Sequence, residues 1–331
     1  MINVSLERLN ELKKNFENKN IAVIGDMMLD AYFWGDTKRI SPEAPVPVIE
    51  IDEEFFRFGG AANVALNLST LKANPFPFGI IGDDNDGEIF KKLMNDANIN
   101  PEGIICDSSR PTTSKARVIA ANQHVVRIDK ESKAEINEET EKKLLDSFMN
   151  IVDNLDAVIL QDYNKGVLTK NLIKSVIDVC NQKDIIVTVD PKFLNFFEYK
   201  NVTVFKPNKK ETEDAFGTKI MNDDDLENLG KELKRKLNSK YVLLTLGEKG
   251  IALFGNGEDI KRIPTKARKV ADVSGAGDTV ISTLTVALSA GAEIEEASYL
   301  ANYAGGLVCE EVGIVPIDID KLFLSVEKDL K

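Results

Sequence analysis

Short runs of apolar residues recur along the chain, and segments with helical spacing lie between them. The runs predict buried strands at 21–26, 78–81, 157–160, 185–189, 202–205 and 241–245. Apolar residues three or four positions apart predict helices at 87–97, 137–152, 169–180 and 223–237. Strands that alternate with helices form a mostly parallel sheet covered on both faces. The pattern therefore predicts an α/β fold whose ligands bind beyond the carboxyl ends of the strands.

Two segments do not follow this rhythm. Residues 44–51 are extended and rich in proline, and residues 115–128 have the pattern of a hairpin with its turn at 121–123. Together they predict a small β-sheet formed by segments at about 33–58 and 112–130, inserted in a single domain that covers 1–331. Such a sheet is either a lid or dimer surface at the mouth of the site, or an extension of the main sheet's edge.

The composition narrows the range of partners. The chain has 331 residues, 29% of them charged, and a net charge of −12. An acidic surface disfavours nucleic acid and anionic membranes as main partners.

His124 is the only histidine, which excludes Ser-His-Asp catalysis and histidine-rich zinc sites. The cysteines lack metal-like spacing and no apolar run approaches a membrane span, so we expect a cytoplasmic protein.

The most specific motif is the stretch at 272–279, DVSGAGDT, which leads into an apolar helix at 280–288. Its glycines let backbone N–H groups converge at the helix N-terminus, where an anion is stabilised. Asp278 lies at the same point. A carboxylate beside an anion hole suits the removal of a proton from a hydroxyl that attacks phosphorus. The alternative is an ordinary glycine turn followed by an acidic first helical turn.

Two further motifs contain polar residues that suit a sugar ligand. Asp26 and Asp30 lie at the carboxyl end of the first strand, and carboxylates bind the hydroxyls of polyols well. Gly59 and Gly60 open a helix and permit close backbone approach to a ligand, while Asn63 offers both a donor and an acceptor. The alternatives are two surface acids and a tight loop with a packing role.

The motif at 206–211, KPNKKE, follows another strand. Asn208 and Glu211 have the spacing of a capping box, and they also suit the organisation of water around a nucleotide-bound Mg²⁺. Lys165 and Lys192 each lie near an acid just past a strand end, which suits a phosphorylated substrate or merely solvated loop charge. Neither a P-loop nor a dinucleotide-binding glycine motif is present in the sequence.

In this order, the motifs resemble those of the ribokinase/PfkB family of sugar kinases. Gly59-Gly60-x-x-Asn63-x-Ala65 is similar to one family signature, and Asp272-x-x-Gly275-Ala276-Gly277-Asp278 to the other. The resemblance covers nearly the whole chain. It narrows to heptose 7-phosphate kinases through the segments at 25–30, 39–48, 162–166 and 190–192, of which RISPEAPVPV at 39–48 is the most telling. It implies a ribokinase-like fold whose inserted β-sheet lid often forms a homodimer contact.

The resemblance also implies roles for individual residues. Asp278 is the expected catalytic base, and the expected anion hole consists of Gly275, Ala276 and Gly277. The expected ATP-binding residues are Asn208, Glu211, Thr245, Gly247 and Asn302, the first two also holding Mg²⁺ through water. The residues expected to face the sugar are Asp26, Asp30, Gly59, Gly60 and Asn63, and those expected at its phosphate are Lys165, Lys192 and Arg127. A monovalent cation near Asp272 is a further expectation.

The implied reaction is ATP + D-glycero-D-manno-heptose 7-phosphate → ADP + heptose 1,7-bisphosphate, a step toward ADP-heptose for the lipopolysaccharide core. The alternatives are a related kinase for fructose phosphate, tagatose phosphate or ribose, a non-catalytic sugar- or nucleotide-binding regulator and, more remotely, an oxidoreductase. Some relatives carry a second, nucleotidyltransferase domain with an H-x-G-H motif. Because His124 is the only histidine, we expect a kinase alone, with the nucleotidyltransferase on a separate polypeptide.

Overall fold

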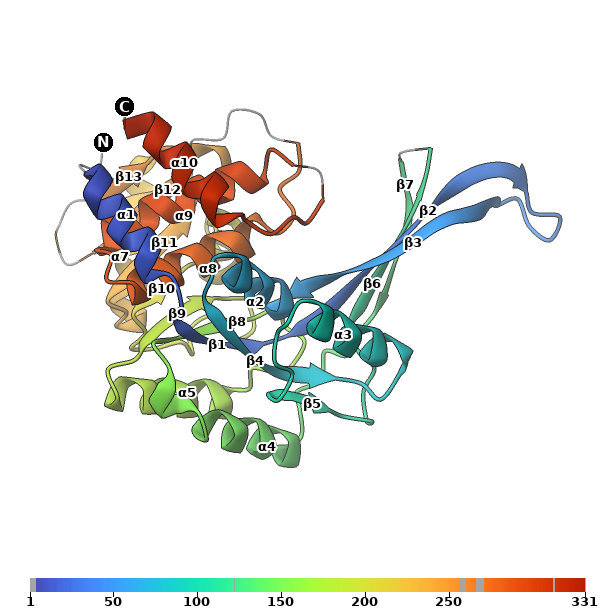
Figure 1. Cartoon of the computed structure of the whole chain (residues 1–331), viewed down its shortest axis with the longest axis horizontal. Coiled ribbons are helices and arrows are strands. Elements are labelled where there is room, and N and C mark those ends of the chain that lie inside the picture. The colour runs from blue at the N-terminus through green and yellow to red at the C-terminus, as the bar shows by residue number, and fades with distance from the viewer. Residues whose placement is uncertain are drawn as a thin grey trace.

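A computed structural model describes residues 4–121, 123–255, 257, 260–265, 271–311 and 313–330. The main sheet contains β1 (Asn20–Gly25), β4 (Asn74–Ile81), β5 (Ile104–Cys106), β8 (Ala157–Gln161), β9 (Ile186–Asp190), β10 (Val204–Phe205), β11 (Tyr241–Thr245), β12 (Ile251–Phe254) and β13 (Lys261–Ile263). Its order is β13-β12-β11-β10-β9-β8-β1-β4-β5 (Figure 1). The strands from β11 to β5 are parallel, whereas β12 and β13 pair antiparallel. The predicted α/β fold is confirmed.

Helices cover both faces of this sheet. One face carries α1 (Leu6–Asn15), α2 (Ala61–Thr70), α3 (Asn85–Asp96), α8 (Ala276–Ser289), α9 (Ile294–Val308) and α10 (Ile319–Leu330). The other carries α4 (Glu138–Met149), α5 (Lys170–Gln182), α6 (Lys209–Phe216) and α7 (Asp223–Leu237). In β1, Ile21 and Val23 pack toward the first group, while Ala22 and Ile24 pack toward the second. Burial on both faces explains why the strands are continuous apolar runs.

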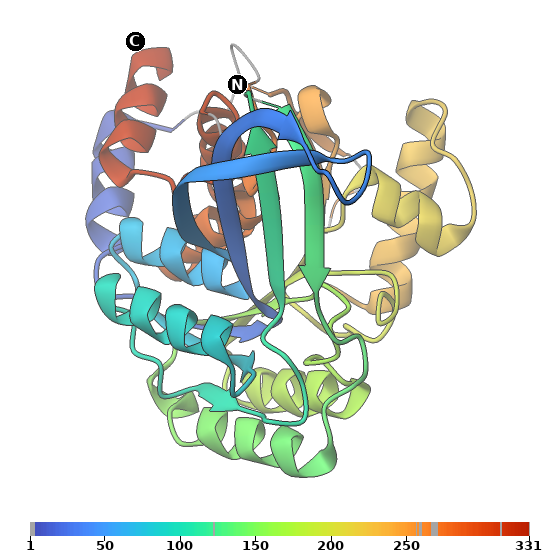
Figure 2. The ribbon, with the colours of Figure 1, turned by 90° about the vertical axis from the view of Figure 1, so that its right-hand side faces the viewer.

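The expected small sheet is present and is separate from the main one. It consists of β2 (Met27–Ile40), β3 (Pro47–Gly60), β6 (Ser114–Ala120) and β7 (Gln123–Lys130), in the order β3-β2-β6-β7. The strands project from the α/β body (Figure 1) and cross in front of it when viewed from their own side (Figure 2). We call this sheet the lid. The expected hairpin turn includes Asn122, which lies outside the described residues.

The register of the lid separates two kinds of side chain. Because successive residues of a strand point to opposite faces, paired residues share a face across neighbouring strands. One face carries the cross-strand rows Arg57, Asp30, Lys115, Asp129 and Phe55, Tyr32, Arg117, Arg127. The opposite face carries the rows Phe56, Ala31, Ala116, Ile128 and Glu54, Phe33, Val118, Val126. The lid therefore has one charged and aromatic face and one mainly apolar face.

Most predicted elements agree with the structure. The helix predicted at 223–237 has the observed bounds of α7, and the strand predicted at 202–205 is reduced to β10. The lid differs most, because β2 begins at Met27, with only Asp26 between it and β1, and residues 44–46 lie outside a strand. None of the helices in the described part of the chain has both the length and the apolar character needed to span a lipid bilayer.

Candidate active site

The N-terminus of α8 is built around two glycines. Gly275, the N-cap residue, has φ +78°, a conformation that strains any residue with a side chain. At Gly277, a Cβ atom would lie 3.6 Å from Asp190 Oδ2 and 3.8 Å from Lys206 Nζ. A longer side chain would extend into the space beside the first helical N–H groups. The glycines thus leave the positive end of α8 accessible, with a lysine next to it.

Asp278 lies in the first turn of α8 and is only 4% exposed. Its Oδ2 accepts a hydrogen bond from Asn63 Nδ2 at 2.7 Å. Its Oδ1 accepts hydrogen bonds from the Tyr163 hydroxyl at 2.8 Å and from Gln161 Nε2 at 3.1 Å. Burial raises the pKa of Asp278 to about 6, although the hydrogen bonds from Asn63 and Tyr163 oppose this rise. A carboxyl with this pKa can accept a proton near neutral pH.

Asp190 and Lys206 form a buried ion pair beside Asp278. Lys206 Nζ lies 3.0 Å from Asp190 Oδ2, and Lys206 is 3% exposed. Both residues lie within motifs visible in the sequence, but we assigned neither a role. The signal was present: each ends or directly follows a short apolar strand, β9 or β10, at the carboxyl edge of the sheet. An acid at the end of one strand and a lysine after the next then lie close together.

Asn208 and Glu211 form the capping box that their spacing predicted. Asn208 Oδ1 accepts the Glu211 backbone N–H at 2.8 Å, and Glu211 Oε2 accepts the Asn208 N–H at 2.9 Å. Glu211 Oε1 is paired with Lys192, whose ammonium also lies 5.4 Å from the centre of the Tyr163 ring. The structure thus groups Lys192 with the capping box rather than with the lid.

The other residues expected at the nucleotide lie along the same edge. Thr245 forms an isolated β-bridge with Asn208. Gly247, two residues later, has φ +61° and begins the short 3₁₀ turn Gly247–Lys249. Asn302, in α9, is 6% exposed and donates to the Pro264 carbonyl at 2.8 Å. Its amide therefore fixes the chain just after β13.

The donor set fits Mg²⁺ only in a particular way. Among the described residues, no group of three or more His, Cys, Asp or Glu side chains could cage a metal ion. The carboxylate of Glu211, beside Asn208, still has lone pairs that can accept hydrogen bonds from water bound to Mg²⁺. Mg²⁺ keeps several waters and is commonly bound through substrate phosphates and one or two carboxylates. The residues present thus fit an ion carried by the nucleotide and contacted through water.

Asp26 is buried beneath the segment at 163–167. Its carboxylate accepts the backbone N–H groups of Tyr163 at 2.7 Å, Lys165 at 3.0 Å and Val167 at 3.2 Å. Burial and the nearby Asp162 raise its pKa to about 6, against the effect of these hydrogen bonds. Both oxygens are thus engaged by the backbone, whereas we expected Asp26 to face the sugar. Its position fixes the segment that carries Tyr163 and Lys165.

Two glycines at the end of β3 allow its backbone to pack closely against Asp26 and Asp30. A Cβ at Gly59 would lie 2.7 Å from Asp30 Oδ2, and one at Gly60, where φ is +59°, would lie 2.4 Å from the Asp26 carbonyl oxygen. Asp30 itself pairs with Arg117 at 2.6 Å. Burial raises the pKa of Asp30, and Arg117 opposes the rise. The glycines therefore bring β3 and α2 against both acids.

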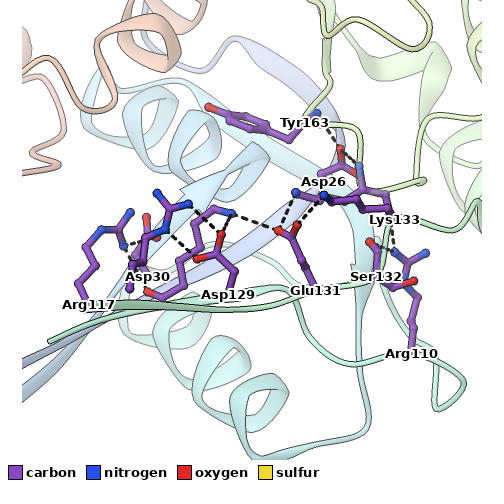
Figure 3. A network of polar contacts seen from close by, with 12 residues as sticks. Asp26, Asp30, Arg110, Arg117, Asp129, Glu131, Ser132, Lys133 and Tyr163 are labelled. Carbon is purple, nitrogen blue, oxygen red and sulfur yellow. Dashed lines mark hydrogen bonds and ion pairs between the residues drawn. The ribbon is translucent and has the colours of Figure 1, made fainter. Parts of the chain in front are cut away.

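Four cations and three acids form a network between the lid and the segment at 163–167 (Figure 3). We call this group the lid cluster; it consists of Lys115, Arg117, Arg127, Lys165, Asp30, Asp129 and Glu131. Glu131 lies 2.6 Å from Lys165 Nζ and 3.3 Å from Lys115 Nζ. Burial alone would raise the pKa of Glu131, but these lysines hold it at about 2. Arg127 pairs with Asp129 at 2.8 Å.

Asp272 orders the loop before α8. One carboxylate oxygen accepts the Ser274 N–H at 2.9 Å, and the other accepts the Gly313 N–H at 3.1 Å. Ile314, the next residue, packs against the Cβ position of Gly275 and receives a hydrogen bond on its carbonyl from Arg57 of the lid. Asp272 therefore links the loop before α8 to the segment at 313–314.

The pfkB family of carbohydrate kinases matches residues 18–320. A relative from Desulfatibacillum aliphaticivorans, named bifunctional protein HldE, is 42% identical over 303 residues, which is 92% of this chain. The chain spans 62% of that relative's length.

Two solved structures share the fold. Phosphofructokinase-2 from Escherichia coli in complex with potassium has a TM-score of 0.75 and 18% identity, covering 94% of this chain and 99% of that one. Ribokinase from Arabidopsis thaliana complexed with ribose and ATP has a TM-score of 0.72 and 20% identity, covering 93% and 99%. At these identities the likeness concerns the ribokinase-like fold, including its sheet flanked by helices.

Proposed function

Because the chain belongs to the PfkB family of carbohydrate kinases, we propose that it phosphorylates C1 of D-glycero-D-manno-heptose 7-phosphate. The family implies a phosphotransferase that uses ATP and Mg²⁺ and has an alcohol group as acceptor. The choice of heptose phosphate rests on the segments at 39–48 and 162–166, which resemble heptose 7-phosphate kinases. The product, heptose 1,7-bisphosphate, would lead toward ADP-heptose and the lipopolysaccharide core.

One observation carries the proposal: a buried carboxylate, Asp278, at the open N-terminus of α8. Asp278 accepts the proton of the C1 hydroxyl as its oxygen attacks the γ-phosphorus of ATP. A pKa of about 6 leaves Asp278 largely ionised at neutral pH while keeping it basic enough for this transfer. Asn63, Gln161 and Tyr163 hold the carboxylate in a fixed orientation through their hydrogen bonds.

The residues around the base stabilise the transferred group. The backbone N–H groups of Gly275, Ala276 and Gly277 form the proposed anion hole at the positive end of α8. Lys206 adds a cation beside it. Asn208 and Glu211 would hold Mg²⁺ through water, and the ion supplies charge neutralisation at the phosphates when bound. Thr245, Gly247 and Asn302 are the proposed contacts to the rest of the nucleotide.

The lid cluster is the proposed site of the phosphate already on the sugar. Lys165, Lys115 and Arg127 all lie near Asp129 or Glu131. A phosphate dianion is negatively charged, as these carboxylates are, and accepts more hydrogen bonds. It can therefore replace the carboxylates as the partner of these three cations. Lys192, which pairs with Glu211, is then better placed for the phosphates of ATP.

The sugar ring lies between this cluster and Asp278 in our proposal. Asp30, Gly59, Gly60 and Asn63 border that space at the root of the lid. Asp26 supports it from below, through the backbone of 163–167. Closure of the lid would exclude water, so that the γ-phosphoryl group of ATP passes to the sugar hydroxyl rather than to water, with ADP as the leaving group.

A coupled assay of ADP release tests the substrate. It compares heptose 7-phosphate, fructose 6-phosphate, tagatose 6-phosphate and ribose, each with ATP and Mg²⁺. We expect the highest kcat/KM with heptose 7-phosphate. A clear preference for another sugar would contradict the heptose assignment and leave the family activity intact, whereas binding without turnover of any sugar would indicate a regulator.

The apolar face of the lid supports a homodimer. Val126 and Ile128 on β7 are 47% and 58% exposed, and they share this face with Phe33 and Phe56. A second copy is the proposed occupant, because two such faces can bury each other in a symmetric contact. Light scattering after gel filtration should give a dimer mass, and the double variant Val126→Asp/Ile128→Asp should give a monomer. A monomeric unaltered chain would contradict this assembly.

A monovalent cation near Asp272 is a further part of the proposal. Asp272 joins the anion-hole loop to the segment at 313–314, so a cation there would stiffen the N-terminus of α8. The similarly folded phosphofructokinase-2 was solved in complex with potassium. Replacing K⁺ with tetramethylammonium at constant ionic strength should lower kcat, and equal rates in both salts would contradict this site.

A further inference from the structure

Gln161 occupies the last position of β8, in the middle of the sheet. It pairs with Gly25 of β1 on one side and with Asp190 of β9 on the other, and it is 1% exposed. Its Nε2 lies 3.1 Å from Asp278 Oδ1 and 3.3 Å from Asp190 Oδ2. An amide nitrogen carries two hydrogens and can donate to both carboxylates. One side chain therefore joins the expected base to the Asp190–Lys206 ion pair.

The other end of this amide has no partner. Gln161 Oε1 is buried and accepts no hydrogen bond from the described part of the chain. Turning the amide over would place this oxygen against two carboxylates, so the arrangement with Nε2 toward them is favoured. A buried acceptor left without a donor costs free energy. A bound molecule that carries a hydrogen-bond donor would satisfy this oxygen.

A hydroxyl of the bound sugar would supply this donor. Oε1 and Nε2 belong to the same amide, and Nε2 already contacts Asp278. A hydroxyl that donates to Oε1 thus lies close to the one that Asp278 deprotonates. Sugars carry hydroxyls on neighbouring carbons, so a single ring can present one to each group.

We propose that Gln161 is a positioning residue for phosphoryl transfer. Its amide hydrogens hold the Asp278 carboxylate beside the Asp190–Lys206 pair, and its carbonyl oxygen accepts a hydrogen bond from a sugar hydroxyl next to the reacting one. This role rests on the proposed kinase function. It adds a residue that fixes the position of Asp278 relative to the sugar hydroxyl that accepts the phosphoryl group.

The charges around Asp278 set the expected response to pH. Asp190 of β9 raises its pKa, whereas Lys206 lowers it, and Lys192 and Tyr163 also face it. Loss of the Gln161 donor removes one of the hydrogen bonds that favour the ionised carboxylate. The acidic limb of the rate profile should therefore move to higher pH when Gln161 is replaced.

Two substitutions separate the two halves of this role. Gln161→Met has similar length but loses donor and acceptor, whereas Gln161→Glu retains an acceptor and loses the donor. Thr285→Val is the matched control, because Thr285 is a fully buried α8 residue whose hydroxyl lies 2.7 Å from that of Thr188. Steady-state kcat and KM are measured from pH 5 to 9 with ATP and heptose 7-phosphate, and thermal melts confirm folding.

We expect Gln161→Met to lower kcat at pH 7 by roughly 10- to 100-fold, to raise KM for the sugar phosphate and to move the acidic limb upward. Gln161→Glu should move the limb at least as far, since it adds a negative charge, but should retain a KM nearer to that of the unaltered chain. If Gln161→Met does not fold, the position of the acidic limb in the pH profile of Gln161→Glu tests the proposal.

Two results would contradict the proposal in different ways. An unshifted limb in both Gln161 variants, with a loss of kcat no greater than that of Thr285→Val, would show that Gln161 has no positioning role while the kinase assignment stands. Absence of phosphoryl transfer by the unaltered chain to any sugar would instead remove the proposed function, and this role with it.

Discussion

Carboxylates are held in opposite ways in two regions of the site. We call Asp278 and the three side chains that donate to it, Asn63, Gln161 and Tyr163, the floor of the site. Asp278 is buried there, and all three of these donors are neutral. In the lid cluster, Glu131 contacts the ammonium groups of Lys115 and Lys165. The same chemical group therefore has a pKa of about 6 on the floor and about 2 in the lid.

The difference in pKa suggests that the two regions have different functions. A base has to exchange a proton near neutral pH. The neutral donors orient Asp278 and lower its pKa, but burial outweighs them and the pKa remains about 6. In the lid cluster, Asp129 and Glu131 have lowered pKa values and stay ionised, and they neutralise cations that would otherwise attract a substrate phosphate. The floor is thus suited to chemistry and the lid cluster to recognition. Each of the following predictions tests one side of this contrast.

The largest effect should come from the floor. Asp278→Asn keeps the size of the side chain but removes the proposed base, so kcat should fall by at least about two orders of magnitude. ATP binding, measured by calorimetry, and the melting temperature should change little. Asp178→Asn, an exposed position on α5, is the control and should retain full activity. Near-normal turnover by Asp278→Asn would remove Asp278 as the base.

Removal of a cation from the lid cluster should act on binding instead. Lys165→Met deletes a charge next to Glu131, and we expect KM for the sugar phosphate to rise roughly 10- to 100-fold, as for loss of a charged hydrogen bond. Because Lys165 is away from the reacting atoms, kcat should stay within about threefold. Lys174→Met, exposed on α5, serves as control. A fall in kcat with unchanged KM would place Lys165 on the floor instead.

The pH dependence should reveal the base. Burial raises the pKa of Asp278 to about 6, so its ionised form is lost as pH falls through that value. The ratio kcat/KM should therefore decline below pH 6 by about tenfold per pH unit and level off above pH 7. In the lid cluster Glu131 stays ionised over this range, because its pKa is about 2. A flat profile from pH 5 to 7.5 would contradict the role of Asp278.

The smallest effect should come from an acid of the lid. Glu131→Gln keeps the shape but releases Lys115 and Lys165 from their carboxylate partner. Since a substrate phosphate would then compete with one charge fewer, KM for the sugar phosphate should fall by roughly threefold, the scale of a partly exposed ion pair. Titration of KM in the variant and the unaltered chain measures this. An increase in KM would indicate that Glu131 positions the lysines rather than competing for them.

The sequence allowed the prediction of much of the fold and of the central motif, because these depend on local pattern. The turn at Gly275 and the position of Asp278 follow from neighbouring residues and the helix they begin. The contact between Asn63 and Asp278 could not be predicted in this way, since it joins α2 to α8 across 215 positions. It required the packing of those two helices.

Other contacts depended on strand order. Gln161 reaches Asp190 because β8 and β9 are neighbours, and Arg117 reaches Asp30 because β6 pairs with β2 in one register. No local pattern carries that information. Asp26 shows the converse, because its place after β1 was predictable but the engagement of both oxygens by the backbone at 163–167 was not.

A two-by-two comparison tests the division between floor and lid most directly. It measures kcat and KM of the unaltered chain and of Lys165→Met, each with heptose 7-phosphate and with the same heptose lacking the phosphate. The account predicts that Lys165→Met raises KM roughly 10- to 100-fold for the phosphorylated sugar and less than about twofold for the other, with kcat preserved. An equal rise in KM for both sugars would contradict recognition of the phosphate by the lid cluster.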